Sequence, residues 1–514
     1  MLLELSFCFL TSFIFQFDMN LILLLIIPFL TAIGILAAKG KSIRIIALAG
    51  TSIQLLYSVV LLKNYLLERS VNKTETFLFQ TKYSWFSNLH IDFFLGIDGI
   101  SMAMILLTAV VVLAGILVSW KMEIMKKEFF FLLILLSAGA YGFFISLDLF
   151  SMFFFLEIAV IPKYLLIGIW GSGKKEYSAN KLALMLMGGS ALILVGLLGV
   201  YFNSADGIPS FNLITLSTQH LPLHFQKIFF PFLFIGFGVF TALFPFHTWV
   251  PDGHSSAPTA ASMFLAGISM KLGGYGCLRV AAFLLPEAAH YYSGTITVLA
   301  AIAILYGAFA TMMQTDLKYM NAYSSVSHCG FVLLGIGMLT TASIHGAVLQ
   351  MVSHGLMTAL FFAVIGMIYE RTHTREVKEL GGLMKMMPFI STIFFITGLC
   401  SLGLPGFSGF VAEMNILIGS WQRPEIFYRI ITVIACMSIV VTAVYILRAT
   451  GSSLMGPVIK KEYLTLPDAT WNERLAAGIL VAGILIMGLT PFIVNNLISP
   501  STEQLMVNIQ RILP

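Results

Sequence analysis

Long apolar stretches recur along almost the whole chain and are separated by short polar connections. A helix that crosses a bilayer needs about 20 mostly apolar residues, and about fourteen stretches reach that length. Periodicity does not show which side of each helix is buried, because lipid-facing and protein-facing sides are both apolar. The predicted spans lie near residues 19–38, 43–62, 99–119, 128–147, 149–170, 180–202, 227–250, 258–284, 294–313, 321–339, 342–369, 389–419, 426–451 and 474–496.

This pattern predicts an all-α integral membrane protein without an inserted soluble domain. Only 10% of the residues are charged, whereas soluble domains carry roughly 25%, so a water-facing surface all round is excluded. The longest connections, near 63–98, 203–226 and 452–473, are too short for an independent core. The first 18 residues are apolar, but they lack a basic segment and a small-residue cleavage site, so we do not interpret them as a signal peptide.

Loop charges predict how the chain sits in the membrane. Connections after odd-numbered spans carry most of the lysines and arginines, for example Lys126, Lys174, Arg371 and Lys378. Because cytoplasmic loops are enriched in these residues, the odd-numbered loops are expected in the cytoplasm. An even number of spans then places both termini outside. The net charge of +5 is interpreted as an orientation signal and not as a nucleic-acid surface.

The cysteines give no sign of a redox or metal centre. All five lie apart in apolar contexts and none belongs to a C-x-x-C pair, so disulfides, an iron–sulfur cluster and a structural zinc site are not expected. They are Cys8, Cys277, Cys329, Cys400 and Cys436.

Five ionisable residues lie near the middle of apolar stretches. They are Glu157, Lys271, His328, His354 and Glu413. A charge at bilayer depth costs about 2.5–3.5 kcal/mol on insertion scales, so such residues commonly mark an ion path or a proton relay. The structural alternative remains for each of them. A buried lysine can hold helices in register as an ion-pair partner, and a membrane histidine such as His345 can serve only as a helix–helix hydrogen bonder.

Two spans contain helix-breaking residues. The stretch 227–250 includes Pro231 and Pro245, and the stretch 389–419 includes the run LGLPGFSGF. Paired broken helices in corresponding halves point to an ion site in transporters built from repeats. The breaks fall in the seventh and twelfth spans, five apart, as a five-helix inverted repeat requires. Simple kinking is the alternative, but Glu413 follows the second break by two turns and favours a functional break.

Two polar motifs at helix ends are interpreted as structural features and not as a metal site. The run HTWVPDGH contains His247, Asp252 and His254, yet it falls at a helix end without a closed ligand set. We expect it to cap the helix and to line the cytoplasmic end of the path, not to bind a metal. Asp316 and Lys318 lie at a helix junction, where a capping ion pair is expected.

Several long motifs resemble one known family. Three of the matching runs are FPFHTWVPDGHSSAPTAASMFLAGISMKLGGYGCLR (244–279), QTDLKYMNAYSSVSHCGFVLLG (314–335) and LGLPGFSGFVAEMNIL (402–417). They resemble the antiporter-like subunits of respiratory NADH:quinone oxidoreductase, complex I, over about residues 19–500. The H-S-x-A-P-T and S-H-G spellings favour the M type over the L and N types and over Mrp-type sodium/proton antiporter subunits.

The resemblance implies a domain organisation and a row of functional residues. It implies fourteen spans, with helices 4–8 and 9–13 as inverted repeats and helices 7 and 12 broken. The expected parts are residues 1–127 with helices 1–3 and an outer loop, 128–284 and 294–451 with the two repeats, and 452–514 with a loop, helix 14 and the tail. The family's proton relay falls on Glu157, Lys271, His328, His354 and Glu413.

The resemblance also implies an activity. The chain is expected to translocate protons as a subunit of a bacterial inner-membrane NADH:quinone oxidoreductase. NADH, FMN, iron–sulfur clusters and quinone would be handled by partner subunits, and the expected neighbours are L-like and N-like antiporter subunits, small membrane subunits and lipid. Two alternatives stay open: an Mrp-type sodium/proton antiporter subunit, and a haem- or quinone-binding subunit that would use His328 and His354.

One position departs from the family pattern. The family places a lysine in the broken seventh span as the ion-pair partner of the fifth-span glutamate, and here that position is Phe240. The fifth span instead carries Lys163, six residues or about 9 Å along the helix from Glu157. We predict that Lys163 replaces the missing lysine and points inward. The alternative is that Lys163 snorkels to the nearer membrane interface and that Glu157 works alone.

Overall fold

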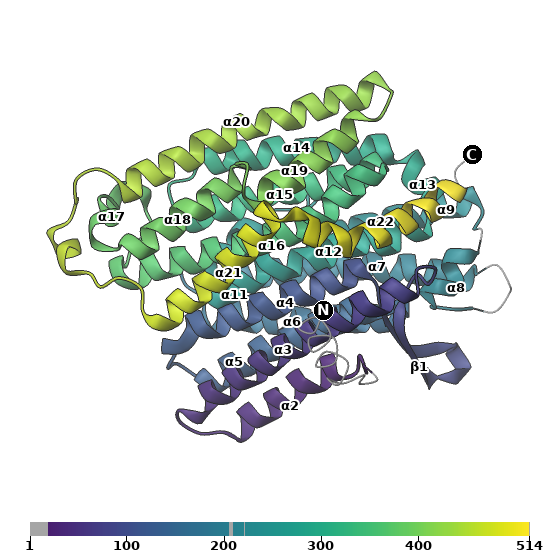
Figure 1. Ribbon diagram of the computed structural model, residues 1–514, viewed down its shortest axis with the longest axis horizontal. Coiled ribbons are helices and arrows are strands. Elements are labelled where there is room, and N and C mark those ends of the chain that lie inside the picture. Colours follow the sequence, from purple (N-terminus) through teal and green to yellow (C-terminus); the bar gives the residue numbers. More distant parts are fainter. Residues whose placement is uncertain (1–18, 205–208, 220, 513–514) are drawn as a thin grey trace, which may run out of the picture.

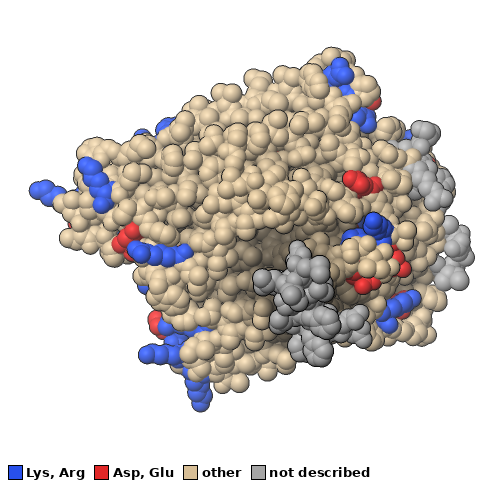
Figure 2. All heavy atoms as spheres, viewed as in Figure 1, with Lys and Arg blue, Asp and Glu red and all other residues tan. Residues whose placement is uncertain are grey.

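The computed structural model describes residues 19–204, 209–219 and 221–512, so the interpretation of the first 18 residues lies outside the described part. Long helices run side by side along one direction, and the loops gather at two opposite ends (Figure 1). We name these ends the α17 end and the hairpin end, after an element at each. On the face shown in Figure 2, the charged side chains lie towards the two ends and the surface between them is almost uncharged. This distribution fits a bundle that spans a bilayer.

The N-terminal part consists of three helices and a hairpin. The strands pair antiparallel, with Tyr83 opposite Phe93, and they project from the bundle at the hairpin end (Figure 1). The hairpin is the one sheet among the described residues, and the spans themselves are helical as predicted. The elements are α2 (Leu23–Ala37), α3 (Ser42–Val71), β1 (Leu78–Phe86), β2 (Ile91–Ile97) and α4 (Gly99–Val118).

The middle of the chain supplies the first predicted repeat. Its elements are α5 (Lys126–Ile145), α6 (Leu149–Trp170), α7 (Lys175–Phe202), the short α8 (Leu213–Thr218), α9 (Leu223–Thr241), α10 (Trp249–Ser256), α11 (Thr259–Phe264) and α12 (Met270–Gly276). Two π-helical segments, Leu265–Ser269 and Cys277–Ala282, flank α12. The eighth predicted span is therefore irregular, which the sequence did not predict.

The last part supplies the second predicted repeat and the C-terminal helices. Its elements are α13 (Pro286–Tyr291), α14 (Ser293–Met313), α15 (Leu317–Met338), α16 (Thr341–Thr372), α17 (Leu383–Met386), α18 (Pro388–Ser401), α19 (Ser408–Trp421), α20 (Ile426–Leu454), α21 (Trp471–Leu489) and α22 (Pro491–Ile512). α16 is deeply enclosed, with 94% of its most apolar stretch buried, so the polar side chains within that stretch face protein and not lipid.

Ten helices in the described residues are long and apolar enough to cross a membrane. They are α3, α4 with its 3-10 extension, α5, α6, α7, α9, α14, α16, α20 and α21. The other predicted spans correspond to α2, to the segment from α11 to the second π-helix, to α15, and to α18 with α19. A multi-pass membrane fold follows, and the count of fourteen stays a prediction.

Both predicted helix breaks are present. In the seventh span, α9 ends before Ala242, which takes a left-handed conformation (φ 69°), and α10 begins at Trp249. In the twelfth span, α18 ends at Ser401 and α19 begins at Ser408. Gly403 and Gly406 lie between them at φ 72° and 96°, a region that glycine adopts without steric cost.

The two predicted repeats share a local arrangement. Asp148 caps α6 by accepting hydrogen bonds from the amides of Phe150 and Ser151, and Asp316 caps α15 in the same way at Lys318 and Tyr319. Each aspartate also forms a β-bridge with a later connection, Asp148 with Asn212 and Asp316 with Glu376. This match agrees with a repeat of the two units, and their inverted relation stays a prediction.

The ion pair at the α15 junction differs from the expected one. Asp316 pairs with Arg375 at 3.0 Å, and the ammonium of Lys318 donates to the carbonyl oxygen of Ala257 at 2.7 Å. Ala257 follows the last residue of α10, where free carbonyl groups attract a cation. The prediction of a capping aspartate is confirmed, and the prediction that Lys318 is its partner is wrong.

Candidate functional site

Four of the predicted site residues lie in a row inside the bundle, in contact at its two ends. Lys271 lies on α12, His354 on α16, His328 on α15 and Glu413 on α19, and none is more than 6% exposed. The row thus joins the irregular eighth span to the broken twelfth span. These contacts connect residues as far apart in sequence as Lys271 and Glu413.

The first contact is between Lys271 and His354. The Lys271 ammonium lies 2.7 Å from His354 Nδ1, and it also donates to the carbonyl oxygen of Ala266. Ala266 belongs to the first π-helical segment. Such segments interrupt the regular backbone hydrogen bonds and occur often at functional sites. The unpredicted irregularity of this span therefore positions a backbone acceptor beside the buried lysine.

The two histidines form the middle of the row. Their ring centroids lie 5.5 Å apart with a tilt of 36° between the planes. The Cys329 sulfur lies 3.9 Å from His354 Nδ1, on the side of the ring that also contacts Lys271. No hydrogen bond joins the two rings in the described part of the chain, so a proton that passes between them needs a ring movement or a water.

The last contact joins His328 to Glu413. His328 Nδ1 lies 3.1 Å from Glu413 Oε1, and its Nε2 lies 3.2 Å from the Ser401 hydroxyl at the end of α18. Gln350 of α16 also reaches His328 Nδ1 at 3.3 Å. An imidazole and a carboxyl group in contact can exchange one proton, so that either the ring or the carboxyl group carries it. This pair can therefore hold a proton on either side.

Glu157 and Lys163 lie outside this row on α6. Lys163 is 1% exposed, and its ammonium lies 5.7 Å from the centroid of the Phe240 ring. Within the described residues, neither that ammonium nor the buried Oε1 of Glu157 has a hydrogen-bond partner, and no ion pair joins them. The side chain of Lys163 is directed into the protein as predicted, and its role stays a prediction.

The two histidines and the aspartate of the HTWVPDGH run take separate partners. His247 lies against Phe244 and Tyr306, with ring centroids 5.4 and 4.9 Å away. Asp252 accepts from the Lys181 ammonium at 2.7 Å. His254 is fully buried and stacks on Phe362 at 5.4 Å. They therefore form no common ligand set, and His254 lies in the interior on the α17 side of the row.

A second buried charge pair was missed by the sequence interpretation. Arg279 of the eighth span pairs with Asp98, which caps α4, and each side chain is 1% exposed. The guanidinium also lies over the rings of Phe77 and Tyr275. Two sequence features pointed to these residues: Asp98 stands before the run GIS as a helix cap, and Arg279 ends an apolar run. Their pairing across 181 residues was not visible in the sequence.

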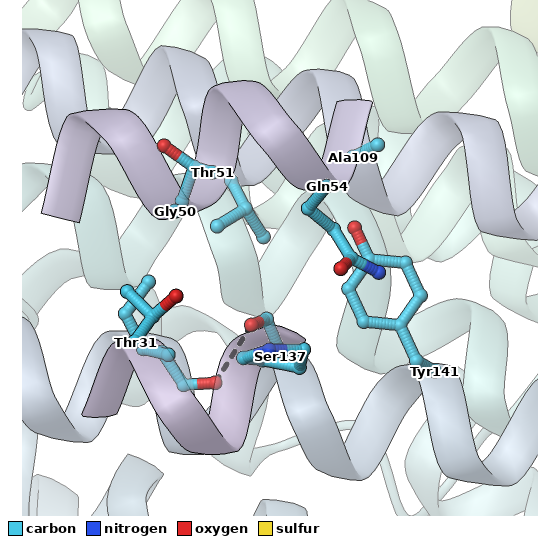
Figure 3. Close-up of a pocket in the computed structure, with 10 residues that line it drawn as sticks. Thr31, Gly50, Thr51, Gln54, Ala109, Ser137 and Tyr141 are labelled. Atoms are coloured by element: carbon cyan, nitrogen blue, oxygen red, sulfur yellow. Dashed lines mark hydrogen bonds between the residues drawn. The ribbon is translucent and has the colours of Figure 1, made fainter. Parts of the chain in front are cut away.

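A polar pocket lies apart from the row, between α2, α3, α4 and α5 (Figure 3). Gln54 and Tyr141 point towards each other across it, and the Ser137 hydroxyl donates to the Ile134 carbonyl oxygen at its edge. Its volume of about 10 Å³ corresponds to roughly one water molecule. None of the predicted site residues lines it, and we give it no part in the row.

Comparisons with known proteins identify relatives of most of the chain. The family described as NADH:quinone oxidoreductase/Mrp antiporter, TM, matches residues 146–439. NADH-quinone oxidoreductase subunit M of Rickettsia bellii is 36% identical over 446 residues, 86% of this chain and 89% of that protein. NAD(P)H-quinone oxidoreductase chain 4 1 of a Synechococcus species is 37% identical over 478 residues, 91% of this chain and 89% of that protein.

Solved structures give the same fold. A chain of respiratory complex I from Thermus thermophilus with bound NADH matches with a TM-score of 0.85 and 25% identity, over 95% of this chain and 99% of that chain. A chain of the Mrp complex from a Dietzia species matches with a TM-score of 0.83 and 18% identity, over 97% of this chain and 100% of that chain. At that identity the second likeness concerns the fold alone.

Proposed function

Because this chain belongs to the NADH:quinone oxidoreductase/Mrp antiporter transmembrane family, we propose that it is the M-type, proton-translocating subunit of a bacterial NADH:quinone oxidoreductase. The observation that carries the proposal is the row Lys271–His354–His328–Glu413, with contacts of 2.7 and 3.1 Å at its two ends. Every member can take up and release a proton, and all are shielded from lipid.

Within the row, each group has a defined task. Lys271 holds a proton next to His354 Nδ1, so a small shift of the ammonium transfers the proton to the ring. His328 exchanges a proton with Glu413, which is the last acceptor in the row. A charge at this depth is costly, so a carboxylate moved towards Lys271 favours the ammonium form and its withdrawal favours release. Such movements are the way in which redox energy can drive proton transfer along the row.

Glu157 and Lys163 form the proposed coupling pair outside the row. The ammonium of Lys163 lies 5.7 Å from the centroid of the Phe240 ring, at the position where the family resemblance leads us to expect the lysine that pairs with the fifth-span glutamate. Both side chains have buried atoms without hydrogen-bond partners in the described residues, so a modest movement of α6 side chains can bring their charges together or apart. The electrostatic field at Lys271 would change with that movement.

The chain contributes no redox centre of its own in this proposal. NADH, FMN, iron–sulfur clusters and quinone belong to partner subunits, and L-like and N-like antiporter subunits are the proposed membrane neighbours. The α17 end, with its excess of lysine and arginine, faces the cytoplasm, and both termini face outside the plasma membrane.

Lys271→Ala tests the proposal directly. In inside-out vesicles that contain the assembled complex, we expect NADH-driven quenching of an acridine-type pH probe to be lost, because the row loses its first proton carrier. The amount of assembled complex should stay unchanged. Quenching at the wild-type level in Lys271→Ala would overturn the relay.

The Mrp-type alternative is favoured by the description of the matching family, which names Mrp antiporters beside NADH:quinone oxidoreductase. It predicts sodium-dependent proton transport that does not require NADH oxidation. Transport assays with and without sodium separate the two functions. The haem alternative predicts a Soret band in the absorbance spectrum of the purified chain.

A further inference from the structure

A cavity at the hairpin end opens to the surface beside the C-terminal helix. Its volume is about 260 Å³, and its walls come from the start of α16, from Gln422 after α19 and from the second half of α22. Thr341, Gln422 and Glu503 are exposed around its mouth. A carboxylate at the mouth of a polar cavity attracts cations, so the charge of Glu503 suits the passage of a proton.

His345 forms the inner wall of this cavity. It is 9% exposed, and its Nε2 lies 3.1 Å from Asn495 Oδ1, whereas its Nδ1 lies 3.3 Å from the Thr502 hydroxyl. Both partners belong to α22. The histidine thus fixes the C-terminal helix against α16, and it also presents a protonatable ring to the cavity.

Only a short, closely packed segment separates this cavity from the row. Gln350, which contacts His328, lies five residues along α16 from His345, or about 7.5 Å of helix rise. Between them α16 meets α19 backbone to backbone, and a Cβ added to Gly346 would lie 2.6 Å from the Ile416 amide nitrogen. The row is therefore closed towards the hairpin end over about one and a half turns of α16.

We propose that this cavity is the outer vestibule through which protons leave the row, with His345 as the receiving group. The inference rests on the proposed function, since it places an outlet beyond Glu413. Separation of α16 from α19 at Gly346 lets water connect the two sites. Glu413 loses one proton and returns to its carboxylate form, His345 takes up that proton, and the imidazolium releases it to water in the cavity.

Cysteine modification from the outer side tests the vestibule. In spheroplasts that carry the assembled complex, Thr341→Cys is treated with a membrane-impermeant, cationic methanethiosulfonate reagent, and NADH-driven proton pumping is then measured in inside-out vesicles. We expect modified Thr341→Cys to pump at least fivefold less per NADH oxidised. Ser84→Cys, exposed on β1 at the same end, is the matched control and should pump normally after equal modification. Cys277, Cys329 and Cys400 are buried and Cys436 is partly exposed, so the wild-type chain treated with the same reagent gives the background.

A pair of variants separates the proton role of His345 from its contact with α22. Asn495→Leu removes one of the two hydrogen bonds between His345 and α22 and keeps the imidazole, so it should pump normally, whereas His345→Leu should pump about tenfold less. Equal losses in the two variants, or normal pumping by modified Thr341→Cys, would overturn the vestibule. Lys271→Ala decides the proposed function independently, because it should lose pumping wherever the outlet lies.

Discussion

The ammonium nitrogen of Lys163 lies 5.7 Å from the centroid of the Phe240 ring, which belongs to the neighbouring helix α9. A cation at this distance from an aromatic ring is attracted to it, and the attraction grows when both groups are removed from water. Lys163 is 1% exposed, so its stem does not extend to a membrane interface. The cation of α6 therefore lies beside the position at which the family resemblance predicts a lysine, and its role as the replacement stays a prediction.

We predict that Lys163→Met lowers NADH-driven proton pumping about tenfold, equivalent to about 1.4 kcal/mol. The reason is that Glu157 then lacks a cationic partner. The double variant Lys163→Met/Phe240→Lys returns the amine from the opposite helix and should recover most of the pumping. Acridine-type quenching in vesicles measures both. Normal pumping by Lys163→Met alone would show that Glu157 works without this lysine.

Substitution of Gly403, in the break of the twelfth span, should disturb proton pumping. This residue has φ +72°, and an added Cβ would lie 3.0 Å from Glu413 Oε2. Gly403→Ala is therefore expected to strain the backbone by about 1–2 kcal/mol and to displace the last carboxyl group of the row. Pumping per NADH should fall several-fold. Gly478→Ala in α21, where a Cβ meets nothing within 4 Å, is the matched control and should keep the wild-type ratio.

Removal of one partner of the buried pair Arg279–Asp98 should strongly destabilise the protein. Arg279→Ala leaves the Asp98 carboxylate uncompensated, which costs about 3–5 kcal/mol for a buried pair. We expect a lower thermal unfolding midpoint and less assembled complex on a native gel. The pair of the exposed Lys82 with the partly buried Asp92 gives the comparison, because Lys82→Ala should cost no more than about 1 kcal/mol. Similar midpoints for the two variants would contradict the expected difference.

The orientation is tested by labelling from the two sides. A cysteine in place of Lys378, between α16 and α17, should react with an impermeant maleimide only in inside-out vesicles. Ser84→Cys on the hairpin should react only in intact spheroplasts. Labelling of Lys378→Cys from outside would show that the orientation is opposite to the predicted one. The direction of proton transport through the row would then also be opposite.

The sequence by itself determined which segments are apolar, where two of them break and which ionisable residues lie at membrane depth. The reasons are local. Span length follows from bilayer thickness, and the run LGLPGFSGF breaks a helix because proline lacks an amide hydrogen and glycine permits the left-handed turn at Gly403. The identity of Lys271, His328, His354 and Glu413 as site candidates also came from the sequence alone.

Only the tertiary structure decided which of these residues meet. Because every side of a membrane helix is apolar, periodicity could not show that Lys271 contacts His354 directly, or that Lys318 donates to Ala257 and leaves Asp316 to Arg375. The π-helical segments beside α12 likewise depend on packing, since no residue in that span forbids a regular helix. These features follow from contacts between helices distant in sequence, and only the folded bundle creates them.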